Sequence, residues 1–362
     1  MCRAGKDGRV RACPGQKNKD RVAKRNARRR FTDMTTSLNK RAAQFAEKVE
    51  QLNKEALAEG KPPLDADTLK AMEAKEVLLQ ASSVTYKRHA EYAHATISQM
   101  TKEGKSTDQV FKQRVTEGGE TEWLPERAKL HLEIVREELE KAKNVPLDRQ
   151  AVISGGLGGA GKSRILQNRS NLDLTQYLVI NPDDIKEVMA AKGLIPKVDG
   201  LSPMEASPLV HAEASHITTL ITKIAVSRGM NIIHDTTMAN LPVTKGKIED
   251  LRSAGYKNVR AIFVDITPES SGTRANKRHL RGHNEYLRGI GQGGRLLPKH
   301  LTELQRTDNP DYNSKNAEGF VEMLEGGYFD SHEAYDNDVH GRDPIKLKSV
   351  NKSLNASLNS LE

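Results

Sequence analysis

The sequence predicts an α/β fold in which a parallel sheet is covered by helices on both faces and is preceded by an all-helical N-terminal region. After residue 150, short apolar runs alternate with helical segments, which is typical of a parallel sheet buried on both faces. Before residue 145, apolar residues recur at spacings of three and four, the period of a helix face. These patterns divide the chain into a helical region, residues 34–145, and an α/β domain, residues 146–350.

The first 33 residues form a basic segment that we expect to be a disordered tail. The whole chain has a formal net charge of +9. Residues 1–30 hold twelve Lys or Arg and two Asp, whereas the rest of the chain is nearly neutral. Such a run can bind nucleic acid through its phosphates, or can simply keep the chain soluble. Cys2 and Cys13 also lie here, and they have neither the paired spacing nor the nearby histidines of a zinc site.

The helical region is expected to contain three helices. Leu38, Ala42, Phe45, Val49 and Leu52 form one apolar stripe, which ends before Gly60 and two prolines. A second helix is expected from about Asp65 to Met100, and a third after Pro125. These stripes indicate packing against a neighbouring element and carry no chemistry of their own.

Five apolar runs are expected to be buried strands of the α/β domain. They are "AVIS" (151–154), "YLVI" (177–180), "MNIIH" (230–234), "VRAIFVDI" (259–266) and "IKLKSV" (345–350). The last residues, 351–362, are expected to be a frayed tail.

The segment "VISGGLGGAGKSRIL" (152–166) contains the phosphate-binding pattern G-x-x-x-x-G-K-[ST] between an apolar strand and a helical segment. In this context the backbone N–H groups surround phosphate oxygens, the Lys reaches the β- and γ-phosphates, and the Ser hydroxyl binds Mg²⁺. We therefore expect a nucleoside triphosphate and Mg²⁺ here. The candidate nucleotide contacts are Gly156, Gly158, Gly159, Ala160, Gly161, Lys162, Ser163 and Arg164.

Two acidic residues follow the second predicted strand, in "INPDDIKEV". Asp183 and Asp184 come at the carboxyl edge of the sheet, where open α/β sheets bind ligands. A carboxylate there can orient an acceptor hydroxyl and take its proton, or can cap the following helix. We expect Asp183 to face the reaction and Asp184 to contact the substrate.

The third predicted strand ends in "HDTTMAN". Asp235 is the expected acidic ligand of Mg²⁺, and Thr236 and Thr237 are expected to contact phosphate or acceptor, although the same residues also suit a turn. The helical segment before this strand begins with "VHAEASHITTLI" (210–221). Glu213, near its start, is a further candidate for lining the substrate cleft.

Arginines follow the fourth predicted strand, together with a glycine-rich stretch. Guanidinium groups on a mobile element can clamp the β- and γ-phosphates, and glycines can supply a hinge, although a solvated basic helix accounts for some of these residues. Arg295, which follows the glycines, is the preferred catalytic candidate, and Arg278 and Arg281 are substrate candidates.

Taken in order, these segments resemble the zeta toxin family of P-loop kinases over about residues 123–340. The resemblance is carried by "LPERAKLHLEIV", "GGLGGAGKS", "INPDDIK", "VHAEAS", "RGMNIIHDTT", "AGYKNVRAIFVDITPE", "GRLLP" and "AYDND". The helical region and the basic tail lie outside it for the most part.

The resemblance implies phosphoryl transfer from ATP or GTP, assisted by Mg²⁺, to a small-molecule hydroxyl. In the characterised toxins the acceptor is UDP-N-acetylglucosamine, so a nucleotide sugar is expected. By the same matching, Lys162 and Ser163 form the nucleotide-binding pair, Asp183 is the catalytic base, Asp235 is the acid at the third strand, and Arg295 binds phosphate. An antitoxin protein is an implied partner.

Two other functions remain open from the sequence. "INPDDI" and "DTTMAN" also resemble segments of bacteriophage polynucleotide 5'-hydroxyl kinases, for which the basic tail could deliver nucleic acid. A non-catalytic nucleotide-binding module is the other possibility. No segment has the length of apolar sequence that a membrane span or a secretory signal needs, so we expect a cytoplasmic protein.

Overall fold

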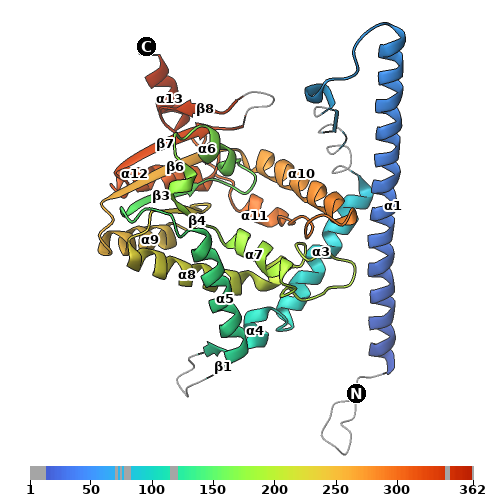
Figure 1. Cartoon of the computed structure of the whole chain (residues 1–362), viewed down its shortest axis with the longest axis horizontal. Helices are drawn as coiled ribbons and strands as arrows, with labels where there is room; N and C mark the ends of the chain where they lie inside the picture. The colour runs from blue at the N-terminus through green and yellow to red at the C-terminus, as the bar shows by residue number, and fades with distance from the viewer. Residues whose placement is uncertain are drawn as a thin grey trace, which may run out of the picture.

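A mostly parallel sheet with helices on both faces forms the centre of the protein (Figure 1), which confirms the predicted fold class. The structure, a computed structural model, describes residues 14–69, 72–73, 76, 83–114, 121–338 and 343–360. Within these residues the main sheet has six strands in the order β4-β5-β3-β6-β7-β8. All of its pairings are parallel except that between β7 and β8. The strands are β3 (Gln150–Gly155), β4 (Leu178–Ile180), β5 (Ile232–Asp235), β6 (Asn258–Asp265), β7 (Ser331–Asp336) and β8 (Ile345–Leu347).

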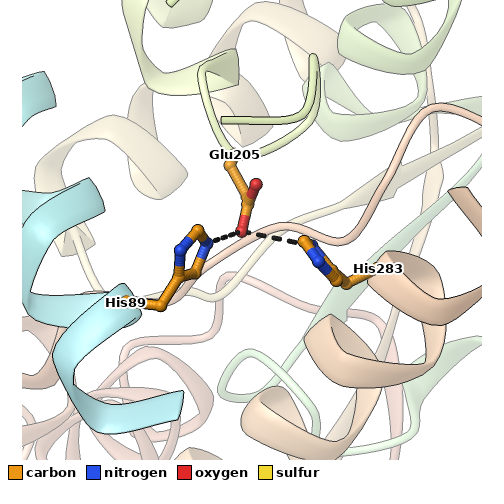
Figure 2. A group of neighbouring side chains, drawn as sticks. All are labelled: His89, Glu205 and His283. Carbon is orange, nitrogen blue, oxygen red and sulfur yellow. Dashed lines mark hydrogen bonds and ion pairs between the residues drawn. The ribbon is translucent and has the colours of Figure 1, made fainter. Parts of the chain in front are cut away.

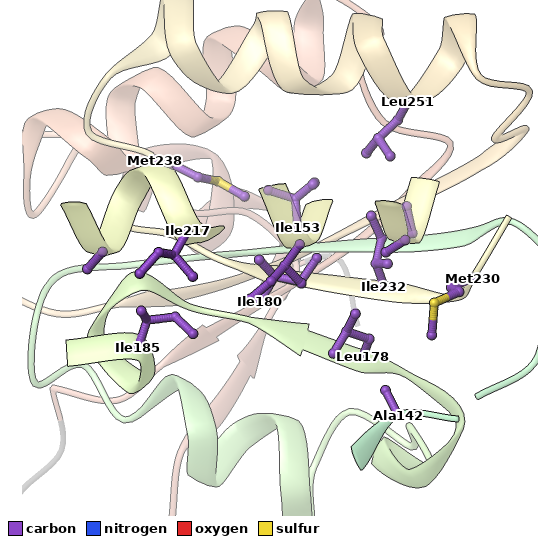
Figure 3. Packing of buried hydrophobic residues seen from close by; sticks show 14 of the residues in the cluster. Ala142, Ile153, Leu178, Ile180, Ile185, Ile217, Met230, Ile232, Met238 and Leu251 are labelled. Carbon is purple, nitrogen blue, oxygen red and sulfur yellow. The ribbon is translucent and has the colours of Figure 1, made fainter. Parts of the chain in front are cut away.

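The central strand, β3, buries side chains on both faces, which explains why its sequence is an almost uninterrupted apolar run. Ile153 belongs to the larger core, which packs beneath α8, α9 and α12 and is shown in Figure 3. Val152, the preceding residue, points to the other face and packs with Ile165 and Leu166 of α6. The sheet is therefore covered on both sides.

The helices of the α/β domain connect and cover the strands. The connection from β3 to β4 contains α6, that from β4 to β5 contains α7 and α8, and that from β5 to β6 is α9. Their bounds are α5 (Pro125–Lys141), α6 (Lys162–Asn168), α7 (Pro182–Ala191), α8 (His211–Arg228), α9 (Leu241–Ser253), α10 (Pro268–Leu287), α11 (Lys299–Glu303), α12 (Lys315–Glu325) and α13 (Lys352–Asn359).

A long helix, α1 (Pro14–Ala58), stands beside the α/β domain, with α3 (Val84–Lys102) between them (Figure 1). Met34 of α1 is buried in a small cluster with Tyr86 of α3 and Leu280 of α10, and Leu287 packs against it. This cluster joins the N-terminal region to the helix that follows β6. None of the helices in the described residues has the length and hydrophobicity needed to cross a bilayer.

The N-terminal segment differs from the expected tail. Helix α1 begins at Pro14, well inside the segment expected to be disordered, and passes through residue 34 without a break. No glycine or proline occurs between Gln16 and Glu59, so nothing in this sequence stops a helix before Gly60. Residues 1–13, with both cysteines, lie outside the described residues.

The region expected to be all-helical also contains strands. After a short helix, α4 (Thr107–Phe111), strand β1 (Lys112–Arg114) pairs antiparallel with β2 (Thr121–Trp123). Trp123 packs edge-on against His131 of α5, with ring centroids 4.8 Å apart, so a tertiary contact overrides the local helical preference.

Two helix boundaries also differ from the expectation. The stretch expected to be one helix from Asp65 to Met100 has a new start at Val84, where the Ser83 Oγ accepts a hydrogen bond from the Tyr86 N–H. The expected C-terminal tail contains α13, which Asn351 caps in the same manner by accepting from the Leu354 N–H.

Candidate active site

The phosphate-binding motif forms a turn, residues 156–161, between β3 and α6, and we refer to it as the phosphate turn. Gly156, Gly159 and Gly161 have positive φ angles of 130°, 83° and 88°. A side chain at Gly156 would also collide with the Val264 carbonyl oxygen, and a Cβ at Gly161 would lie 2.6 Å from Nδ2 of Asn337. Both positions therefore require glycine.

Lys162, the first residue of α6, folds back over this turn. Its Nζ donates to the carbonyl oxygen of Gly156 at 3.0 Å and lies 3.7 Å from Oδ1 of Asp235. Asp235 ends β5 and accepts hydrogen bonds from the Ser154 Oγ at 2.8 Å and the Asn181 Nδ2 at 3.2 Å. The structure thus places the motif Lys beside the acid that follows the third predicted strand.

Asp183 lies in the first turn of α7, which Asn181 caps by accepting from the Asp183 N–H at 2.9 Å. Its carboxylate contacts Lys186 Nζ at 3.0 Å and forms an ion pair with Arg295. Burial raises the pKa of Asp183, but the charges of Lys186 and Arg295 outweigh it, so the pKa lies below its ordinary value. Asp183 is therefore ionised at neutral pH.

Asp184 titrates in the opposite direction. Burial, with the negative charges of Glu187 and Asp235, raises the pKa of Asp184 to about 6. The carboxylates of Asp184 and Asp235 therefore lie close enough to repel each other. Carboxylate and hydroxyl oxygens are the ligands that Mg²⁺ prefers, so Asp235 and Ser163 fit the ion expected there.

The arginines of the glycine-rich segment separate into two groups. Arg278, on α10, lies near the Arg295–Asp183 pair. Burial, and next the positive charge of Arg295, lower the pKa of Arg278. Arg281 lies on the same helix but is exposed. The structure brings Arg278 and Arg295 to Asp183, and it does not bring Arg281 there.

Glu213 is placed differently from the expectation. Its side chain is fully buried at the start of α8, where it accepts hydrogen bonds from Arg127 Nη2 at 2.9 Å and His131 Nε2 at 2.6 Å. Arg127 and His131 belong to α5, so the carboxylate ties two helices together and does not line a cleft. The expectation that Glu213 contacts substrate is wrong, because its oxygens are already occupied and inaccessible.

Three further expected residues have backbone or surface contacts. Thr236 donates from Oγ1 to the Ser154 carbonyl oxygen at 2.9 Å, and the Thr237 carbonyl oxygen accepts from the Gly156 N–H at 3.3 Å. The first contact holds the end of β3, and the second holds the phosphate turn, against the segment that follows β5. Arg164 is exposed and its Nη2 lies 3.3 Å from Asp343, so it points away from the turn.

Sequence reasoning missed several residues that shape this site. Asn337, after β7, donates from Nδ2 to the Ala160 carbonyl oxygen at 2.6 Å, and Asn181 bridges α7 to Asp235. Asn316 donates to the Thr237 carbonyl oxygen at 2.9 Å. Asn181 and Asn337 lie within quoted segments, "INPDDIK" and "AYDND", but an isolated Asn carries no signal that separates a distant contact from a local turn.

A cavity of about 690 Å³ lies between α3, α10 and the segment around Leu297. Leu297 also approaches the position of a Cβ on Gly158 to 3.6 Å, so the cavity borders the phosphate turn. The expected catalytic residues do not line it. Tyr86 and His94, from the N-terminal region, form part of its wall.

Comparisons with known proteins found one matching family and several similar structures. A family model described as Zeta toxin matches residues 136–310. Among solved structures, the chain is similar to one from the PezAT chromosomal toxin-antitoxin system of the human pathogen Streptococcus pneumoniae. That likeness has 14% identity and a TM-score of 0.46, and it covers 66% of this chain and 89% of that chain.

A second similar structure is AvrRxo1-ORF1:-ORF2 with ATP, at 17% identity and a TM-score of 0.44, over 71% of this chain and 81% of that chain. No curated protein sequence matches the chain.

Proposed function

We propose that this protein, of which residues 136–310 match a family model described as Zeta toxin, is a P-loop kinase. In this proposal it transfers the terminal phosphoryl group of ATP or GTP to a hydroxyl of a small molecule, a nucleotide sugar such as UDP-N-acetylglucosamine. One observation carries the proposal: Lys162 and Asp235 at the phosphate turn share the carboxyl edge of the sheet with the Asp183–Arg295 pair. The groups proposed to bind the phosphate donor therefore lie next to those proposed to activate the acceptor hydroxyl.

In the proposed reaction the phosphate turn holds the triphosphate through its backbone N–H groups, and Lys162 leaves Gly156 to contact the β- and γ-phosphates. Ser163 and Asp235 would hold Mg²⁺, which would neutralise negative charge on the triphosphate. Lys162 then adds a second positive charge to the oxygens on which negative charge develops.

Asp183 orients the acceptor hydroxyl and takes its proton as the oxygen attacks the γ-phosphorus, while the bond to the β-phosphate oxygen breaks and the diphosphate leaves. The Arg295 guanidinium pairs with Asp183 in this structure. In the proposed reaction it exchanges this carboxylate for the γ-phosphate of the donor. Binding of the donor would therefore release the base.

The experiment is transfer of label from γ-labelled ATP or GTP by the full chain, offered in parallel UDP-N-acetylglucosamine, a 5'-hydroxyl oligonucleotide and a metabolite extract. Asp183→Asn should retain nucleotide binding and lose about 10²–10⁴-fold in kcat. Lys162→Ala should lose transfer as well, by about 10²–10³-fold.

Arg164→Gln is the matched control, because that side chain lies in the same helix as Lys162 but pairs with Asp343 at the surface. Unchanged turnover in Asp183→Asn would contradict the role of this residue as base. ATP binding without transfer to any acceptor would favour a nucleotide-binding module.

A polynucleotide acceptor is the second candidate. Arg21, Arg25 and Arg29 are exposed on one side of α1, at spacings of four, and could hold a phosphate backbone. Helix α1 stands apart from the phosphate turn (Figure 1), so these arginines do not line the candidate active site. Label on the oligonucleotide, lost in the triple Arg→Gln variant, would establish this function in place of the first.

The zeta toxin family also leads us to propose an antitoxin protein as a partner. Such a partner would act most directly by covering the edge that carries Asp183 and Arg295. Its presence is testable by co-purification of the native chain from its own cell.

A further inference from the structure

Two histidines and a glutamate from three separate elements meet in the protein interior, outside the candidate active site (Figure 2). His89 lies on α3, His283 on α10, and Glu205 in the turn before the short helix η2 (Ser207–Val210). Their exposed fractions are 1%, 0% and 1%. One possible ligand atom from each lies within 4.8 Å of the other two.

The glutamate at the centre is an ionised carboxylate, because donors surround both of its oxygens. Oε1 of Glu205 contacts His89 Nε2 at 2.7 Å and His279 Nε2 at 2.9 Å. Oε2 accepts from the N–H and the Oγ of Ser202, at 2.7 and 2.8 Å. A carboxylate in this arrangement has no need of a proton of its own.

A buried carboxylate of this kind needs a compensating positive charge. The ion-pair partners of Glu205 within the described part of the chain are histidines, His89, His279 and His283, and no Lys or Arg is among them. The compensating charge must therefore come from a proton on an imidazole or from a bound cation.

We propose that His89, Glu205 and His283 bind a divalent transition-metal ion of the zinc type. Imidazole nitrogen together with a carboxylate oxygen suits zinc, whereas Mg²⁺ and Ca²⁺ prefer ligands that are all oxygen. This ion is distinct from the Mg²⁺ expected at the phosphate turn, both in its ligands and in its place in the fold.

The two distances from Glu205 to the histidines need only a small adjustment for an ion to enter. Oε1 of Glu205 is 2.7 Å from His89 Nε2 and 3.6 Å from His283 Nδ1. In a tetrahedral site with bonds of about 2.0 Å, ligand atoms lie about 3.3 Å apart. One contact would lengthen and the other would shorten, each by a rotation of the side chain.

The surrounding groups are of the kind that orient metal ligands. His279 lies against the same carboxylate oxygen, and its other ring nitrogen contacts the hydroxyl of Tyr86 at 3.2 Å. Ser202 fixes the second oxygen. Such outer contacts hold ligand carboxylates in position, and losing one typically weakens metal affinity by about 10–100-fold.

The proposed ion lies directly beneath the loop that carries Arg295. A side chain on Gly293 would collide with Ser202, and one on Gly294 would collide with the backbone of His279, so this loop packs closely on the cluster. The Met204 N–H also donates to the Gln292 carbonyl oxygen at 3.0 Å. The metal would therefore fix the loop whose next residue pairs with Asp183.

One ligand comes from outside the family domain. Glu205 and His283 lie within residues 136–310, whereas His89 belongs to the N-terminal region. The site would thus form only where α3 docks on the domain, and the metal would join the two parts.

The test uses the untagged full chain, dialysed against a chelator and then titrated with ZnCl₂ or CoCl₂. We expect one ion per chain by elemental analysis, a visible Co²⁺ absorption typical of tetrahedral coordination by nitrogen and oxygen, and a rise in Tm on adding Zn²⁺. No phosphate acceptor is needed, so the result stands apart from the proposed kinase activity.

His89→Gln and His283→Gln should each reduce the bound ion to background, and His279→Gln should weaken binding by about 10–100-fold. His332→Gln is the control, because that histidine is exposed on β7. Circular dichroism separates loss of metal from loss of fold. A folded wild-type chain that takes up neither ion, or folded His89 and His283 variants that retain it, would overturn the proposal.

Discussion

At the scale of single residues, Asp183 and Asp184 are neighbours whose pKa values move apart. The pKa of Asp183 is lowered and that of Asp184 is raised to about 6. A general base acts only when deprotonated, so a reaction that uses Asp183 keeps its rate as the pH falls from 8 to below 6. One that used Asp184 would lose rate with an apparent pKa near 6.

We therefore expect kcat/KM to stay level across pH 6, as measured by initial rates at subsaturating acceptor. Asp184→Asn should leave the shape of this profile unchanged. A decline with an apparent pKa near 6 that disappears in Asp184→Asn would assign the base to Asp184 instead.

Gly294 offers a test of how the Arg295 loop is held. Because a Cβ there would collide with the His279 carbonyl oxygen, Gly294→Ala should displace the loop and lower kcat by about 10²-fold, with a smaller effect on nucleotide binding. Gly246→Ala on α9, where a Cβ meets no atom within 4 Å, is the control. Equal rates for the two variants would mean that the packing of this loop does not position Arg295.

At the scale of elements, the Glu213 carboxylate joins α8 to Arg127 and His131 of α5. The hydrogen bonds from His131 and Arg127 outweigh the effect of burial and lower the pKa of Glu213 to about 2. Since this pKa is depressed, the ionised group stabilises the fold above pH 4.5, and this contribution is lost as the pH falls from 4.5 toward 2.

Glu213→Gln should therefore lower the free energy of unfolding at pH 7 by about 3 kcal/mol, because it leaves Arg127 buried without its counterion. The variant should also lack this part of the decline in stability between pH 4.5 and 2. Urea unfolding at several pH values measures both. Glu137→Gln, which breaks an exposed pair with Lys192, should cost at most about 1 kcal/mol, and equal costs would contradict our account.

The elements also show which predictions the sequence supports. The apolar runs that became β3, β5 and β6 were recognisable, since burial of both faces excludes most polar residues from these strands. The runs of β4 and β8 form the two edge strands of the sheet. The expectation that β8 is buried is wrong, because Ile345 is 49% exposed and no residue of this strand is buried. The strand β7 was missed because "SHEAYD" has exposed Ser331 and His332 at its start, and its Glu333 pairs with Arg260 of the neighbouring strand.

The phosphate turn was equally recognisable, because its glycines and Lys162 act within a few residues of one another. Glu213 was misplaced because its partners lie 82 and 86 positions away in the sequence, where no local pattern reveals them. A polar residue at a helix start looks the same whether it lines a cleft or holds a buried arginine.

At the scale of the whole molecule, Met34 anchors α1 to the rest of the structure through Tyr86 and Leu280. Met34→Ala should remove most of this buried contact and release α1, with an increase in the radius of gyration measured by small-angle X-ray scattering. The core of the α/β domain should keep its Tm within a few degrees. Val22→Ala, at an exposed position on α1, is the control. An unchanged radius of gyration would show that other contacts hold the helix.

The hydrogen bond between Asn337 and Ala160 makes the support of the phosphate turn depend on a residue that is synthesised late. These residues are 177 positions apart, so the ribosome makes the phosphate turn long before it makes the amide that supports it. Such distant contacts form late in folding. A nascent or cleaved chain that ends before Asn337 would hold the motif in an unsupported loop, so the proposed phosphoryl transfer would begin only after nearly the whole domain has been synthesised.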